Sequence, residues 1–146
     1  MNLKEDIYLN NILLFEINKN TIIKNFGKPI NISKPEYECG SYSNETQNAV
    51  FETLNYTGFQ FIGSNNSVYS LENINFKNLP EKQIFRIKNI ILNKEIKQEE
   101  AVKEFKKYYN FNKEDNFLIF PTNSDFKLIL EFENNKLSKC YFEESC

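Results

Sequence analysis

The feature that most constrains the fold of this chain is an internal repeat. Residues 7–14 align with residues 85–92, and after a gap of one residue 16–26 align with 95–105. Such self-similarity indicates copies of one supersecondary unit. The identical pairs are Asn11/Asn89, Ile12/Ile90, Leu14/Leu92, Glu16/Glu95, Ile17/Ile96, Lys24/Lys103 and Phe26/Phe105. The sequence therefore predicts two tandem units, residues 1–78 and 79–146, either as two small domains or as one continuous domain.

Each unit begins with an apolar-alternating segment, which predicts a short strand or extended edge leading into a short amphipathic helix. In the first unit Asn18 or Asn20 can cap this helix, and Gly27 ends it. The apolar stripes comprise Ile22, Ile23 and Phe26 in the first helix, and Ala101, Val102, Phe105 and either Tyr108 or Tyr109 in the second. The second helix lacks the glycine stop, so it is expected to run to about Tyr109.

Segments of alternating apolar and polar residues follow each helix. They predict strands at residues 49–54, 56–62 and 68–76, and at 117–120, 126–132 and 137–142. Residues 133–136 are typical of a hairpin loop, 77–82 of a linker, and 30–46 of an irregular segment. The predicted fold class is α+β, with two tandem copies of a helix packed on antiparallel strands. The residues expected to be largely buried are Phe26, Phe105, Leu128, Leu130, Phe132 and Phe142.

Composition and charge exclude several classes of function. The 146 residues contain no histidine, and the net charge of −2 comes from interspersed acids and bases. The absence of histidine removes Ser-His and Cys-His pairs and imidazole metal sites, and no phosphate-binding or dinucleotide motif is present. No basic stripe offers a surface to nucleic acid. We therefore expect a protein that is not an enzyme, uses no cofactor or metal, and does not bind nucleic acid directly. The abundance of Asn, Ile and Lys is interpreted as a bias of AT-rich coding DNA.

The ends of the chain and its cysteines indicate a cytoplasmic protein. The N-terminus lacks the basic and apolar regions of a signal peptide, and no apolar run is long enough to span a bilayer. Cys39, Cys140 and Cys146 are odd in number and lack metal-ligand spacing, so reduced thiols are expected. A bridge from Cys39 to Cys140 or Cys146 stays an alternative.

Two segments are candidate protein-binding sites. Strand parity places Ile129, Glu131, Tyr141 and Glu143 on the face of the sheet that the helices leave free. Aromatic and acidic groups on one face are typical of a protein-binding surface. The competing site is the irregular segment, with Glu36, Tyr37 and Glu38. A solvated face with cross-strand ion pairs to Lys127 and Lys139 explains the acidic residues equally well.

The helix stop Phe26-Gly27-Lys28-Pro29, with residues 7–14 before it and 56–61 after it, resembles the bacterial families of the β-lactamase-inhibitor-protein type. The resemblance covers most of the chain, although the second unit lacks the Gly-x-Pro turn. It implies a curved antiparallel sheet in each unit and a function in binding proteins. Cytoplasmic relatives of this architecture include immunity proteins encoded beside contact-dependent toxins. The resemblance thus implies an inhibitor that occludes a cognate toxin domain, such as a nuclease, encoded by a neighbouring gene. The alternative is an assembly module with another protein partner.

Overall fold

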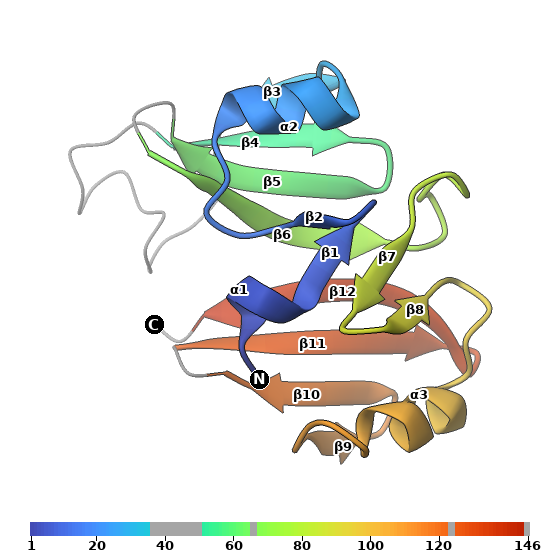
Figure 1. Cartoon of the computed structure of the whole chain (residues 1–146). Coiled ribbons are helices and arrows are strands. Elements are labelled where there is room, and N and C mark those ends of the chain that lie inside the picture. The colour runs from blue at the N-terminus through green and yellow to red at the C-terminus, as the bar shows by residue number, and fades with distance from the viewer. Residues whose placement is uncertain (36–50, 65–66, 123–124, 145–146) are drawn as a thin grey trace.

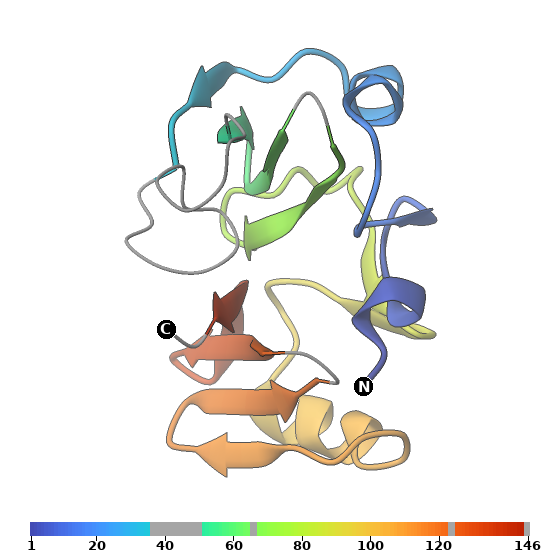
Figure 2. The same ribbon diagram turned by 90° about the vertical axis from the view of Figure 1, so that its left-hand side faces the viewer.

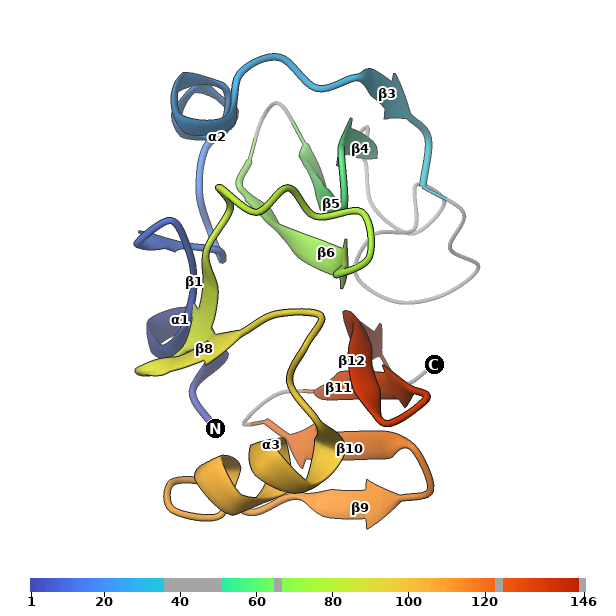
Figure 3. The same ribbon diagram turned by 90° about the vertical axis from the view of Figure 1, so that its right-hand side faces the viewer.

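The computed structural model describes residues 1–35, 51–64, 67–122 and 125–144. The chain is an α+β protein with two antiparallel sheets and few helices (Figure 1), so the predicted fold class is confirmed at this level. Helices α1 (Leu3–Asp6), α2 (Lys19–Phe26) and α3 (Gln98–Phe105) lie on the same side of the larger sheet as the smaller sheet does (Figures 2 and 3).

The smaller sheet consists of two short hairpins. Its order is β2 (Ile12–Leu13), β1 (Ile7–Leu9), β7 (Phe85–Ile87) and β8 (Ile90–Leu92). Residues 7–14 and 85–92, each predicted as a short strand or extended edge, both contain two short strands joined by a turn. Asn10 and Asn11 adopt φ values of 52° and 66°, and Lys88 adopts 53°, which is the left-handed geometry of tight hairpin turns. Strands β1 and β7 pair antiparallel, with Ile7 opposite Ile87 and Leu9 opposite Phe85.

The larger sheet has eight strands, and strands from both halves of the chain meet at its centre. In spatial order they are β3 (Asn31–Ser33), β4 (Phe51–Tyr56), β5 (Phe59–Ser64), β6 (Tyr69–Asn75), β12 (Lys136–Glu144), β11 (Phe126–Glu133), β10 (Phe117–Pro121) and β9 (Asn112–Glu114). Strands β6 and β12 pair through Asn73–Tyr141, Ile74–Cys140 and Asn75–Lys139. Each sheet thus combines strands from before and after the predicted linker.

The predicted strands from Val68 onward agree with β6, β10, β11 and β12 to within two residues. The β4–β5 hairpin is displaced from its predicted position, because the chain turns at Thr57 and Gly58 rather than near Asn55. Gly58 has a φ of 86°, which favours glycine. The edge strands β3 and β9 were not predicted, since three exposed residues carry too little alternation to indicate a strand.

The ends of α2 agree with the sequence. The Asn18 side chain accepts a hydrogen bond from the Thr21 amide at 2.8 Å, which selects Asn18 over Asn20 as the cap. Gly27 follows with a φ of 79°. The α-helix of the second unit ends at Phe105, and one further turn reaches Tyr109, whose amide donates to the Phe105 carbonyl. Tyr109 rather than Tyr108 faces the interior, since Tyr108 is 47% exposed.

One hydrophobic core joins the two sheets and the helices. Four of the six predicted core residues are buried, namely Phe105, Leu128, Leu130 and Phe132. Phe26 and Phe142 are only partly buried and pack against the edge of this core. Phe26 contacts Phe59 and Phe61 of β5, whereas Phe105 contacts Phe120 of β10, so each longer helix covers a different half of the sheet.

Cys140 lies within the core with a free thiol, and its burial raises the pKa of that thiol. The alternative of a bridge to Cys140 is therefore wrong. Cys39 and Cys146 lie outside the described residues. Among the residues that the structure describes, no helix has the length and apolar character needed to cross a membrane.

A partly buried polar cluster makes the stability of this fold depend on pH. Lys19 Nζ and the Tyr69 hydroxyl both donate to Glu52 Oε1, at 2.7 and 2.6 Å. Burial alone would raise the pKa of Glu52. The hydrogen bonds from Lys19 and Tyr69 and the charge of Lys19 together outweigh burial, so the pKa lies below its ordinary value of 4.5. A lowered folded-state pKa stabilises the protein above the unfolded pKa, and this contribution is lost as pH falls through the folded pKa.

We therefore expect Glu52→Gln to lower the free energy of unfolding at pH 7, and expect its difference from wild type to shrink as pH falls below about 4.5. Urea denaturation from pH 7 to pH 3 measures this difference. Glu95→Gln is the matched control, because the Glu95–Lys136 pair is 65% and 52% exposed and should contribute little. A Glu52→Gln difference that is independent of pH would contradict the expectation.

Candidate functional site

The outer face of the larger sheet, opposite the core, carries a row of residues in register across all eight strands. Because successive side chains point to opposite faces, the neighbours of the buried Leu54, Phe61 and Ile74 lie on this face. The row comprises Asn31, Asn55, Gln60, Asn73, Tyr141, Ile129, Ile119 and Asn112, from β3 to β9. Its first four members, which we name the amide row, all bear side-chain amides.

The amide row is a directional chain of hydrogen bonds. Asn73 Nδ2 donates to Gln60 Oε1 at 2.7 Å, and Gln60 Nε2 donates to Asn55 Oδ1 at 2.5 Å. Asn55 Nδ2 then donates to Asn31 Oδ1 at 2.7 Å. Every donor thus points toward the edge strand β3. Such chains polarise their members and hold them in one orientation.

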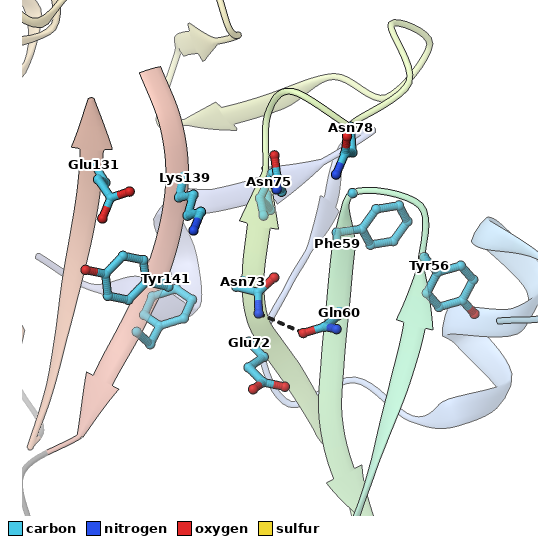
Figure 4. Close-up of a pocket in the computed structure, with 13 residues that line it drawn as sticks. Tyr56, Phe59, Gln60, Glu72, Asn73, Asn75, Asn78, Glu131, Lys139 and Tyr141 are labelled. Atoms are coloured by element: carbon cyan, nitrogen blue, oxygen red, sulfur yellow. Dashed lines mark hydrogen bonds between the residues drawn. The ribbon is translucent and has the colours of Figure 1, made fainter. Parts of the chain in front are cut away.

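A groove of about 700 Å³ opens at the centre of the outer face, where β5 and β6 meet β12 and β11. Gln60, Asn73 and Asn75 lie on one side of it, and Glu131, Lys139 and Tyr141 on the other (Figure 4). Tyr56 lies at the end of β4, and Asn78 lies close to Asn75, just beyond the end of β6. The remaining lining residues are Gly58, Phe59, Glu72, Ile74 and Phe142. We name this feature the central groove.

The second side of the central groove is ionic. Glu131 and Lys139 are cross-strand partners on β11 and β12. Burial, and then the negative charges of Glu131 and Glu143, raise the pKa of the Tyr141 hydroxyl. The structure therefore brings Glu131, Tyr141 and Glu143 together, as strand parity predicted.

Ile129 does not fit the prediction of an exposed apolar contact. It lies on the outer face beside Tyr141, but it is only 4% exposed. Ile129 lies on an inner strand, and its cross-strand neighbours Ile119 and Tyr141 flank it on both sides. These neighbours cover the side chain of Ile129 even though it points to the outer face. The competing site at Glu36, Tyr37 and Glu38 lies outside the described residues.

Sequence reasoning missed the amide row. Its members are separated by up to 42 positions in the chain and become neighbours only through strand pairing. The available signal was an amide in each of two consecutive predicted strands, Gln60 and Asn73, whereas Asn55 fell between the predicted strands 49–54 and 56–62. That signal was attributed to composition, because asparagine is frequent throughout the chain.

The groove offers hydrogen bonds and charge, which suits binding. In the described parts of the chain no group of three or more His, Cys, Asp or Glu residues could hold a metal ion. The groove is lined by two carboxylates, one ammonium, two phenols and four side-chain amides. These groups recognise polar partners by hydrogen bonding and electrostatics. No protein-family model, curated protein or solved structure matches this chain.

Proposed function

We propose that this chain is a cytoplasmic protein-binding inhibitor, an immunity protein that neutralises a cognate bacterial toxin domain by occluding it. The observation that carries the proposal is the central groove, a polar recess in the middle of a broad sheet face with two acidic residues and a tyrosine beside it. Acidic groups on such a face attract a cationic partner, for example a nuclease domain, and an aromatic side chain slows its dissociation.

We also propose that the chain arose by tandem duplication of one unit, residues 1–78 and 79–146. The strand pairs at the centres of the two sheets, β1–β7 and β6–β12, support this origin. Pairing of Ile7 with Ile87 and of Leu9 with Phe85 is unchanged when the aligned positions of the two halves are exchanged. Such self-complementary pairing is the pattern of a two-fold axis.

Two matching β-bulges provide further support. The register shifts after Gln60 in the β5–β6 ladder and after Glu131 in the β11–β12 ladder. Aligning the halves on these bulges makes Gln60 equivalent to Glu131, Asn73 to Lys139 and Asn75 to Tyr141. All three pairs line the central groove.

The proposed equivalence gives the groove a direction. The first unit contributes neutral amides, whereas the second unit contributes a carboxylate, an ammonium and a phenol at the corresponding positions. A ligand that is itself asymmetric fits such a groove in one orientation only. The toxin would thus be held in a single pose by a site made from both units.

Charge reversal tests the proposed function. We expect Glu131→Lys/Glu143→Lys to lower the association rate constant for the protein encoded by the neighbouring gene by about tenfold or more at low salt. The rate of the variant should also depend less on salt, because fewer attractive charges are screened. Stopped-flow or surface-plasmon-resonance measurements at several ionic strengths record both quantities.

Glu81→Lys/Glu100→Lys is the matched control. Both residues are exposed and neither lines the groove, and the change in net charge is the same. Equal effects of the two double variants would mean that net charge matters rather than the outer face. Absence of binding between the wild-type chain and the neighbouring gene product would refute the immunity function and favour an assembly module.

A further inference from the structure

The two edge strands of the larger sheet differ in charge. At one edge, β9 carries Lys113 and Glu114, and all three of its residues are exposed. Charged side chains on an edge strand discourage the addition of another strand. At the other edge, the three residues of β3 are equally exposed but bear no charge. Of the two edges, β3 alone lacks the charges that protect an edge.

Isoleucines make the β3 edge apolar. Ile32 pairs with the buried Leu54 of β4, so its side chain points to the inner face of the sheet. It is nevertheless 49% exposed. Ile30, immediately before the strand, is 69% exposed, more than any other large apolar side chain in the described part of the chain. Exposed apolar residues on an edge strand favour pairing with another strand.

The backbone of Ile32 faces the free side of β3. The Asn55 carbonyl accepts a hydrogen bond from the Ile30 amide at 2.7 Å, so the backbone groups of Asn55 point toward β3. Asn55 is paired with Asn31, and the next pair is Ile32 with Leu54. Because backbone groups of successive residues point to alternate sides of a strand, the N–H and C=O of Ile32 point away from β4. Among the described strands β4 is the only neighbour of β3, which lies at the margin of the molecule (Figure 3).

The amide row ends at this edge with a donor. Asn31 Oδ1 accepts from Asn55 Nδ2, and no described residue accepts a hydrogen bond from Asn31 Nδ2. Because every donor in the row points toward β3, the terminal amide is polarised to donate further. Ser33 Oγ accepts from Asn55 Nδ2 at 2.9 Å, and a hydroxyl oxygen has a second lone pair. The edge thus carries a side-chain donor and a side-chain acceptor on either side of Ile32.

From these observations we propose that β3 pairs antiparallel with β3 of a second copy of this chain, with Ile32 at the two-fold axis. In this register the two Ile32 residues exchange N–H to C=O hydrogen bonds, and Asn31 lies opposite Ser33 of the second copy. Asn31 Nδ2 donates to the Oγ atom of that serine, and the symmetric bond runs the other way. The two Ile32 side chains meet on the inner face and are withdrawn from water together.

A second copy fits this edge because the strand is complementary to itself. Read in opposite directions, Asn-Ile-Ser places a donor against an acceptor and isoleucine against isoleucine, with no charge to be buried. Contacts of this kind generate closed two-fold dimers. The axis is perpendicular to the sheet, so the central grooves of both copies open on the same side, away from the interface. Dimer formation needs no other partner and is independent of the proposed inhibitor role.

The dimer is expected to be weak. Pro29 and Pro35 lack the N–H groups that would extend the ladder, so few residues pair, and small interfaces bind weakly. We expect a dissociation constant on the order of 100 µM. Sedimentation equilibrium of the full chain from about 10 µM to about 1 mM should show the average mass rising from that of the monomer toward twice that value. In ¹⁵N spectra of the same series, the Ile32 amide and the Asn31 NH₂ group should shift, whereas the Lys113 amide should not.

Opposite charges at position 32 test the register. Ile32→Lys and Ile32→Glu each place two like charges at the axis, so each variant alone should dimerise about tenfold more weakly or less than that. An equimolar mixture should regain mixed dimers, because the axis then carries one charge of each sign. Ile91→Lys and Ile91→Glu are the matched controls. Ile91 is 56% exposed on β8 of the smaller sheet, and both of its variants should self-associate like the wild type.

Three results would each overturn the inference: a wild-type chain that stays monomeric at about 1 mM, concentration-dependent shifts that spare β3, or a mixture of the two Ile32 variants that associates no better than either alone. Spectra of each variant at low concentration establish that the fold is intact. If the wild type stays monomeric but the neighbouring gene product shifts the Ile32 amide, the edge binds a foreign strand, and the second-copy inference fails while the proposed function stands.

Discussion

Truncating Phe105 to alanine is expected to lower the free energy of unfolding by about 3–5 kcal/mol. Phe105 is the last residue of α3, and its side chain is 0% exposed. Its ring lies 5.1 Å from that of Phe120 on β10 and 6.2 Å from that of Tyr109. The side chain therefore fills the seam between the second helix and its half of the sheet, and its removal leaves a cavity that rigid strands cannot close.

Urea denaturation at pH 7 measures this loss. Tyr108→Ala is the matched control, because it removes an aromatic ring from the same turn at a site that is 47% exposed. Exposed positions of this kind usually change stability by less than about 0.5 kcal/mol. A loss below about 1 kcal/mol in Phe105→Ala would mean that the interior adjusts around the missing ring.

Replacing Gly58 with alanine is expected to destabilise the fold by about 2–5 kcal/mol. Gly58 has a φ of 86°, a region that disfavours residues with a Cβ atom. An added Cβ would also lie 2.6 Å from both the Cα and the amide nitrogen of Leu79. These are backbone atoms, so they cannot move aside as the end of a flexible side chain can. Relief requires displacement of the turn or of the segment that links the two halves.

Gly27→Ala separates the two causes. Gly27 also has a positive φ, of 79°, but no atom lies within 4 Å of the position of an added Cβ. Its substitution carries the conformational cost alone, about 1–3 kcal/mol. Denaturation of both variants should show the larger loss for Gly58→Ala. Equal losses would mean that the segment at Leu79 yields to the methyl group at little cost.

Several local features could be predicted from the sequence because short-range chemistry decides them. The Asn18 cap and the Gly27 stop of α2 depend on backbone groups within a few residues. Strand β11 follows from alternation alone, and its Leu128, Leu130 and Phe132 are buried as predicted. The same alternation placed Glu131, Tyr141 and Glu143 near one another.

The first hairpins show where local patterns are insufficient. Residues 7–14 and 85–92 have the alternation of single strands, yet each folds back at a two-residue turn. Asn10 and Asn11 tolerate the left-handed conformation, but so do asparagines elsewhere in this asparagine-rich chain. The pairing of β1 with β7 selects the turn, and that contact joins residues separated by almost 80 positions.

The sequence by itself determined the α+β class, the helix ends and the inner face of the C-terminal strands. Periodicity and capping depend only on residues that are close together in the chain. Tertiary structure alone decided the β6–β12 junction, the central groove, the amide row and the burial of Ile129. These features need strands from both halves to align in one register. That register follows from the packing of a shared core and from loop closure over long distances, which no local pattern encodes.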